Sequence, residues 1–472
     1  MSVKTLAPNK SNSPARVIAR ALMGEHQDFT QGSLRRAVVL LAIPMIIEMG
    51  MESVFAVVDL FFVSKLGKHA VSTIGLTESV LTLIYSVGMG GSMAATALVA
   101  RRVGEKNREG AANTALQAIL VGIGLSLATG ITGAVFAPDI LRLMGAEPGT
   151  IAIGATYTRL MMASSPAIIL LFLINGIFRG AGDAAMAMRS LMLANICNII
   201  LCPVLILGLG PVPALGLTGA ALATTIGRSI GVGYQLWYLF NGKGVVRLAA
   251  VKLRAEWALI RSLLGVAWPA ALQFLIGSCS WIVLARLVAE TGGSTASAGY
   301  QTAIRLVIFF ILPAWGISNA AATLVGQNLG AQNPARAEAA VWKTVKYNVI
   351  FMVGVTLLFV LGARPLIGVF AKDPGIIEVG VRALRIISTA YIFYGAGMVF
   401  TNALNGAGDS RTPTWINVFG FWLFQIPLAW VLAKKLGMGP TGVFIAIPVA
   451  ETAITLASFV MFRKGRWKKV QV

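Results

Sequence analysis

The chain contains an internal repeat at an offset of about 226 residues. Phe178–Asp183 (FRGAGD) returns as Leu404–Asp409 (LNGAGD), and Gly104 returns as Gly330, both at an offset of 226. Further matches at offsets of 223 to 226 are Pro148-Gly149 with Pro374-Gly375, Ala42 and Pro44 with Ala267 and Pro269, and Gly216-Thr218-Gly219 with Gly439-Thr441-Gly442. Short matches in a nearly constant register indicate that the chain consists of two related halves.

Each half is made of apolar runs that are long enough to cross a bilayer as helices. Only 12% of the residues are charged, about half the usual share of a soluble domain. The sequence therefore predicts an all-α integral membrane protein with twelve transmembrane helices. The predicted spans are 37–63, 71–99, 111–136, 151–177, 189–208, 216–241, 259–289, 298–327, 341–363, 379–404, 412–434 and 440–462.

The repeat divides the spans into two lobes of six. The expected divisions are an N-terminal tail 1–34, a lobe 35–241, a linker 242–258, a second lobe 259–463 and a basic tail 464–472. Because six is even, the two repeats run parallel across the membrane, and in such folds substrates bind between the halves near mid-bilayer. Rocking of one lobe against the other predicts alternating access.

Basic residues are distributed unevenly between the two ends of the spans. Of the 39 Lys and Arg residues, 26 belong to the N-terminal tail and to the loops and span ends on its side, and 10 belong to those on the opposite side. The remaining three, Arg228, Arg286 and Arg305, lie deeper inside spans. The positive-inside rule then places both termini in the cytoplasm, so the net charge of +21 reports topology and not nucleic-acid binding. Residues 1–34 contain no apolar segment of a cleavable signal peptide. We expect a solvated tail there, with a short surface helix near 15–23 as the alternative.

An enzyme is not expected from the residue inventory. The two histidines, His26 and His69, fall outside the spans, so no intramembrane metal cluster is predicted. No Gly-x-x-x-x-Gly-Lys phosphate loop occurs, which removes ATP as a direct energy source, and we expect no cofactor. Three cysteines, all inside spans, give no disulfide framework.

Three carboxylates share one face of the first span. Glu48, Glu52 and Asp59 are separated by four and eleven residues, which places them within roughly 40° on a helix. Each costs about 2.5–3.5 kcal/mol at mid-bilayer, so they should face a wet cavity or partners. Such acids are candidates for taking up and releasing a coupling ion. Pairing with a local arginine, or a position near an end of the span, is the structural alternative.

The sequence resembles the multidrug and toxic compound extrusion family from about residue 35 to 462. The resemblance rests on Ala42-Ile43-Pro44, Val58-Asp59, Leu66-Gly67, Leu98 through Gly104, Asn175 with the Phe178–Asp183 turn, and Asn195 with Asn198. It implies two six-helix bundles around a V-shaped cavity that export organic cations in exchange for protons or sodium ions. We further expect a monomer with small-molecule substrates and lipid as its partners, and a bacterial cytoplasmic membrane is the default location.

One departure from the family pattern concerns the ion site. The family's span five carries Asn, three residues, then Asp-Pro, whereas this chain has Asn198 followed by Cys202-Pro203. A thiol does not serve as a hard oxygen ligand for sodium. Asp59 matches the family's acid in span one, and we hypothesise that Glu52 or Glu48 replaces the missing acid. Asn198, Asn175 and Thr224 would then form hydrogen bonds around Asp59.

The second lobe lacks the corresponding acids. Gln273 stands where Glu48 stands and Leu284 where Asp59 stands, and span ten offers Tyr394, so coupling is expected in the N-terminal lobe. The predicted substrate or cavity residues are Asn175, Asn195, Thr224, Gln273 and Tyr394.

Charged residues at the repeated turns and in the last span of each half leave alternatives open. Arg179 and Asp183, with Asp409 in the second repeat, form either a gating latch or capped turns that fix helix angles. Arg228 and Glu451 either pair across the cleft or are satisfied within their own lobes. A flippase for a lipid-linked or anionic metabolite is the alternative function, because its cationic cleft could use Arg286 and Arg305.

Overall fold

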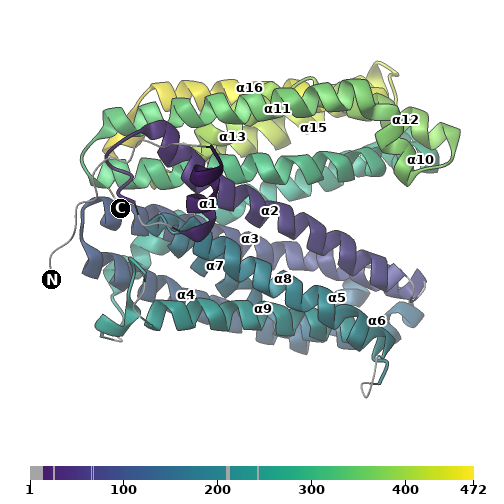
Figure 1. Cartoon of the computed structure of the whole chain (residues 1–472). Coiled ribbons are helices and arrows are strands. Elements are labelled where there is room, and N and C mark those ends of the chain that lie inside the picture. Colours follow the sequence, from purple (N-terminus) through teal and green to yellow (C-terminus); the bar gives the residue numbers. More distant parts are fainter. Residues whose placement is uncertain are drawn as a thin grey trace.

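The computed structural model is helical throughout the part of the chain that it describes (Figure 1). The description covers residues 14–24, 27–64, 66, 68–208, 213–241, 244–252 and 254–471, without the side chains of 14–16, 56, 57, 59, 60, 64, 68, 71 and 250. Within these residues there is no β-strand. The all-α prediction is therefore confirmed.

The N-terminal lobe follows the first six predicted spans. Its helices are α2 (Leu34–Ser64), α3 (Lys68–Gly104), α4 (Arg108–Val135), α5 (Ala137–Leu143), α6 (Pro148–Ala163), α7 (Ser165–Ala181), α8 (Ala184–Leu207) and α9 (Gly216–Phe240). Predicted span 151–177 is divided between α6 and α7 at Ser164, because Pro166 in the first turn of α7 has no N–H to continue the hydrogen-bond ladder. In the tail, the helical alternative is observed as α1 (Pro14–Met23), which packs on α2.

The C-terminal lobe repeats this arrangement. Its helices are α10 (Trp257–Gly330), α11 (Pro334–Phe370), α12 (Pro374–Ser388), α13 (Tyr391–Gly406), α14 (Arg411–Asn417), η2 (Val418–Gln425), α15 (Ile426–Trp430), η3 (Val431–Lys435) and α16 (Pro440–Arg463). Helix α10 contains two predicted spans. A kink at Gly293 separates them, where the backbone leaves the helical region with φ 68° and ψ −165°. The short helices η1 (Leu248–Ala250) and η4 (Arg466–Lys469) lie in the linker and the C-terminal tail.

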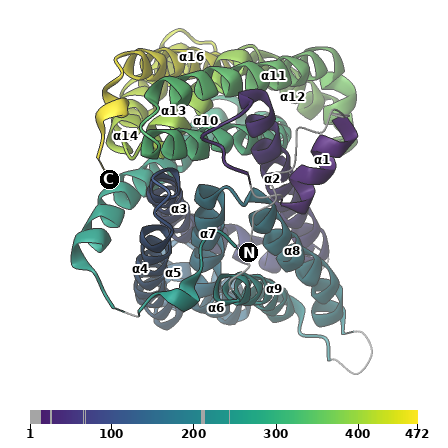
Figure 2. The same cartoon turned by 60° about the vertical axis from the view of Figure 1, so that its left-hand side comes forward.

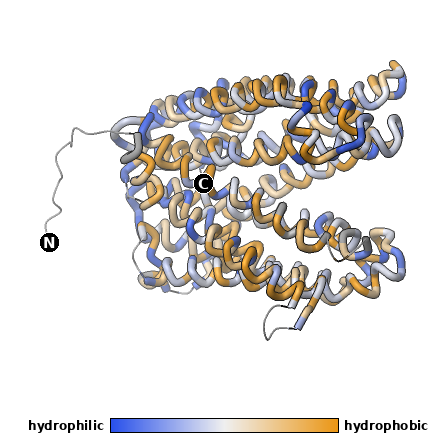
Figure 3. Tube along the Cα trace, turned by 45° about the vertical axis from the view of Figure 1, so that its right-hand side comes forward, coloured by the Kyte–Doolittle hydropathy of each residue, from blue (hydrophilic) through white to orange (hydrophobic). Residues whose placement is uncertain are grey.

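Nine helices in the described residues are long and apolar enough to cross a membrane. Helix α10 accounts for two predicted spans, and α9 and the α12–α13 pair occupy the remaining two. Helices α12 and α13 have 15 and 16 residues, so each alone is shorter than a span, and α9 carries Arg228 in its middle. Hydrophobic residues run along the helices, whereas hydrophilic residues gather at both ends of the bundle (Figure 3).

The two lobes approach one another at the end where the described C-terminal tail lies and diverge toward the other end (Figures 1 and 3). Glycine makes this approach possible, because a Cβ atom on Gly104 would lie 1.9 Å from the carbonyl oxygen of Gln327. A Cβ atom on Gly330, the repeat equivalent of Gly104, would lie 2.1 Å from the carbonyl oxygen of Arg101. The ends of α3 and α10 are therefore in direct backbone contact, and we call this region the closed end.

The described parts of the N-terminal and C-terminal tails contact the closed end (Figure 2). Arg336 donates a hydrogen bond to the carbonyl oxygen of Gln31 at 2.8 Å, and Arg101 donates one to that of Val470 at 2.5 Å. Trp467 is fully buried and stacks on Phe462 at 5.0 Å. Thus the basic C-terminal tail is anchored in one lobe and contacts the other.

Candidate functional site

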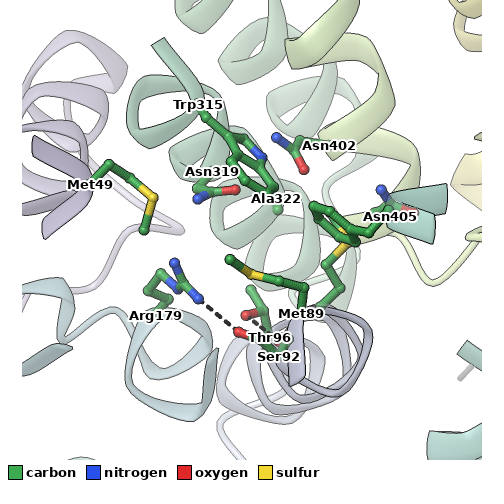
Figure 4. Close-up of a pocket in the computed structure, with 13 residues that line it drawn as sticks. Met49, Met89, Ser92, Thr96, Arg179, Trp315, Asn319, Ala322, Asn402 and Asn405 are labelled. Atoms are coloured by element: carbon green, nitrogen blue, oxygen red, sulfur yellow. Dashed lines mark hydrogen bonds between the residues drawn. The ribbon is translucent and has the colours of Figure 1, made fainter. Parts of the chain in front are cut away.

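A cavity lies between the lobes near the closed end, and Figure 4 shows the residues that line it. Helices α2, α3 and α7 line it from the N-terminal lobe, and α10 and α13 line it from the C-terminal lobe. The lining residues are Met49, Met89, Ser92, Met93, Thr96, Arg179, Phe274, Trp315, Asn319, Ala322, Asn402, Asn405 and Gly406. We call this space the central cavity.

The lining combines adaptable apolar side chains with a few polar groups. Methionine side chains reshape easily and aromatic rings offer flat contact surfaces. Arg179 and Asn319 point into the same space from opposite lobes (Figure 4). A lining of this composition suits a small amphipathic molecule.

Arg179 connects the central cavity to a buried acid. Its side chain is 7% exposed, and its Nη1 lies 3.5 Å from Oε1 of Glu48, which is completely buried. Its Nη2 donates to the hydroxyl of Ser92 at 2.7 Å. The amide of Asn175 donates to the same Glu48 oxygen at 3.0 Å, and the amide of Gln235 donates to Asn175 at 2.6 Å. Glu48 therefore sits behind the cavity wall in a hydrogen-bonded network.

The second lobe contains a neutral counterpart of this pair. Gln273 and Asn405 are the repeat equivalents of Glu48 and Arg179, at offsets of 225 and 226. Their side chains exchange hydrogen bonds of 3.1 Å and 3.2 Å. The same position is thus held by an ion pair in one lobe and by an amide pair in the other.

Glu52 makes a second ion pair one turn further along α2. Its Oε1 lies 3.2 Å from Nη2 of Arg228, which also donates to the hydroxyl of Tyr85 at 3.2 Å. The guanidinium is held over the rings of Phe55 and Phe172 at 5.3 and 5.7 Å. These contacts of Arg228 all lie within its own lobe, which corresponds to the alternative without an ion pair to Glu451 across the cleft.

Glu451 lies apart from Arg228, in a smaller cavity inside the C-terminal lobe. This cavity is lined by Trp281, Tyr391, Tyr394 and Glu451, among others. The predicted cavity residue Tyr394 therefore belongs to this space. Gln273 lies in the amide pair with Asn405, behind the central cavity.

The remaining predicted ion-site residues lie within the N-terminal lobe. The amide of Asn198 donates to the hydroxyl of Thr224 at 3.1 Å, joining α8 to α9. Asn195 is buried on α8, one turn before Asn198. Asp59 belongs to α2, but its side chain lies outside the described residues, so its partners stay a prediction.

The repeated turns show helix caps. Gly182 has φ 84° at the end of α7, and Asp183 accepts a hydrogen bond from the backbone N–H of Met186 at 3.2 Å. Asp409 accepts from the backbone N–H of Thr412 at 3.1 Å. The Phe178–Asp183 turn also contacts the other lobe, because Gln327 donates a hydrogen bond to the carbonyl oxygen of Gly180 at 3.0 Å.

Three cavity asparagines were not identified from the sequence. Asn405 had a usable signal, because it is the repeat equivalent of Arg179. Asn319 and Asn402 had none, because Met93 and Gly176 stand at their equivalent positions in the first half. Their part in the cavity depends on how α10 and α13 face α3 and α7.

Comparisons with known proteins cover nearly the whole chain. The family model MatE matches twice, over residues 44–204 and 269–431. A probable multidrug resistance protein NorM from Thermotoga maritima is 26% identical over 441 residues, covering 92% of this chain and 94% of that protein. An FAD transporter from Shewanella oneidensis is 26% identical over 445 residues, covering 94% and 97%. A solved structure titled as the outward-facing conformation of a multidrug resistance MATE family transporter of the MOP superfamily superposes with a TM-score of 0.88. It is 25% identical and covers 94% of this chain and 98% of that one.

Proposed function

Since this chain belongs to the multidrug and toxic compound extrusion (MatE) family of membrane transporters, we propose that it exports amphipathic organic compounds in exchange for protons or sodium ions. Members of this family are transporters and not enzymes. The observation that carries the proposal is the central cavity, which both lobes line and which the closed end seals on one side. Alternating access requires such a site between two lobes that can rock.

The charge distribution supports an orientation for this state. With both termini in the cytoplasm, the closed end faces the cytoplasm, and the cavity lies on the path to the outside. This conformation then corresponds to the stage at which a substrate leaves, and a bacterial cytoplasmic membrane fits such an exporter.

The coupling ion is proposed to bind at the acids of α2. Asp59 is the first candidate because it matches the family's acid, and Glu52 and Glu48 lie on the same helix. The arginine partners of Glu48 and Glu52 connect these acids to the helices α7 and α9. An ion that binds there changes the packing of α2, which also lines the cavity through Met49. This linkage is what exchange of ion for substrate needs.

The structure gives no support to the cation preference that the family resemblance implies. Glu48 and Glu52 are each paired with an arginine, so their charges are balanced locally. Arg286 and Arg305, which motivated the flippase alternative, are both exposed and do not line the central cavity in the part of the chain that the structure describes. They therefore provide no cationic cleft for that alternative.

Transport in proteoliposomes tests the proposal. Efflux of a fluorescent lipophilic cation and of an amphipathic anion would be followed under a pH gradient and, separately, under a sodium gradient. We expect gradient-driven efflux of at least one probe, with loss of driven efflux in Asp59→Asn and retained efflux in the surface variant Glu378→Gln. Equal flux with and without either gradient would refute ion-driven exchange.

A further inference from the structure

We propose that the central cavity recognises an amphipathic organic anion, with the guanidinium of Arg179 as the group that binds its carboxylate. This inference rests on the proposed function only in taking the central cavity as the substrate site. It concerns the charge of the substrate, and it departs from the cation preference that the family resemblance implies.

Arg179 is placed to bind a ligand while remaining anchored. A guanidinium has five N–H donors in a planar fork that matches a carboxylate. In the described part of the chain, Glu48 and Ser92 engage two of these donors. The side chain is nearly buried yet forms part of the cavity wall. A charge-assisted hydrogen bond formed there is strong because the surroundings exclude most water.

The rest of the wall is compatible with an anion and offers no counter-charge to a cation. Among the described lining residues there is no aspartate or glutamate. Asn319, Asn402 and Asn405 carry amide N–H groups that can donate to a ligand oxygen. The rings of Phe274 and Trp315, 5.0 Å apart, provide a surface for an apolar body.

Glu48 acts as the built-in counter-ion of Arg179. Behind the cavity wall it balances the guanidinium in the absence of a ligand, which avoids an unpaired buried charge. A ligand carboxylate must compete with Glu48 for the same side chain. The amide pair of Gln273 and Asn405 shows that the fold holds this position without any charge. The ion pair is therefore not required for packing, which points to a role in binding.

This assignment has a consequence for coupling. Protonation of Glu48 and binding of an anion to Arg179 would each favour the other, because each weakens the ion pair between the two residues. Exchange requires the ion and the substrate to compete. We therefore assign ion exchange to the other acids of α2, Asp59 and Glu52, and charge recognition to the Glu48–Arg179 pair.

Equilibrium binding tests the inference without any gradient. Isothermal titration calorimetry on the full chain in detergent would compare three ligands with one aromatic body: 1-naphthaleneacetate, 1-naphthaleneacetamide and 1-naphthylmethylammonium. The variants are Glu48→Gln, which removes the competitor, and Glu48→Gln/Arg179→Asn, which reproduces the amide pair of the other lobe. Glu451→Gln is the control, because it removes a buried glutamate that does not line the central cavity.

We expect the acetate to bind most tightly of the three ligands. Glu48→Gln should tighten acetate binding by about tenfold, and the double variant should weaken it by about tenfold relative to the parent, the range of one hydrogen bond to a charged group. Affinity in Glu451→Gln should not change. Because the double variant leaves no buried charge unpaired, a folded protein is expected, and a single symmetric peak in size-exclusion chromatography checks it.

Three results would overturn the inference: tightest binding of the ammonium ligand, weaker acetate binding in Glu48→Gln, or unchanged acetate affinity in the double variant. Absence of acetate binding in both the parent and Glu48→Gln would overturn it equally. If driven efflux is observed but the acetate does not bind, only the charge assignment fails. If the acetate binds as expected but no gradient drives efflux, the proposed exchange fails and the site remains.

Discussion

Adding one methyl group at the closed end should shift the protein toward the opposite conformation. In Gly104→Ala the new Cβ would lie 1.9 Å from the carbonyl oxygen of Gln327, and in Gly330→Ala it would lie 2.1 Å from that of Arg101. Both contacts involve backbone atoms, which cannot move aside as a flexible side chain can. The helices α3 and α10 must therefore separate.

The size of the effect follows from these distances. Reaching an ordinary contact of 3.4 Å requires a separation of 3.4 − 1.9 = 1.5 Å at Gly104. Forcing extra methyl groups into tight packing costs about 1–3 kcal/mol. This penalty applies only to the conformation in which the lobes touch at this end, so it changes the ratio of the two conformations by about 5- to 150-fold.

Distances between spin labels across the closed end measure this shift. Labels at Glu109 and Ala335, both exposed, would be introduced after replacing the three native cysteines. We expect longer label distances and reduced efflux in Gly104→Ala and Gly330→Ala. Gly124→Ala and Gly354→Ala are the matched controls, because a Cβ there meets no atom within 4 Å. Distance distributions identical to those of the controls would refute the reasoning.

Three further predictions concern the tail and the turns. Trp467→Ala should destabilise the protein by about 3–5 kcal/mol, because the ring is fully buried, whereas Trp257→Ala, 78% exposed, should change its melting temperature little. The hydrogen bond from Lys468 holds the pKa of Glu338 below its ordinary value of 4.5. This contact therefore stabilises the tail at pH values above 4.5 and is lost as the pH falls through the lowered pKa. Limited proteolysis should release the tail faster in acid, and Glu338→Gln should remove this pH dependence. Asp183→Ala should cost about 1 kcal/mol through loss of the α8 cap, measured by thermal unfolding; an unchanged melting temperature would contradict it.

Local sequence patterns determined the elements of this protein. Apolar runs in lipid have to become helices, because only then are all backbone hydrogen bonds made within the segment. Spans such as 111–136 therefore correspond closely to α4 (Arg108–Val135). The repeat also predicted two similar lobes, because related sequences adopt similar folds. Breaks within spans were less visible: the division between α6 and α7 depends on one serine and a following proline, which a hydropathy pattern does not weigh.

Partners between helices were decided only by the tertiary structure. The sequence placed Glu48 and Glu52 on one face of a helix, but it contained no information that Arg179 and Arg228 would meet them from α7 and α9. Likewise, the repeat marked Gly104 and Gly330 as equivalent, and only packing showed that each meets the backbone of the opposite lobe. A helix fixes the direction of its own side chains, whereas the residue across the gap depends on how whole helices are rotated and crossed. The charge of the central cavity is therefore a property of the assembled bundle.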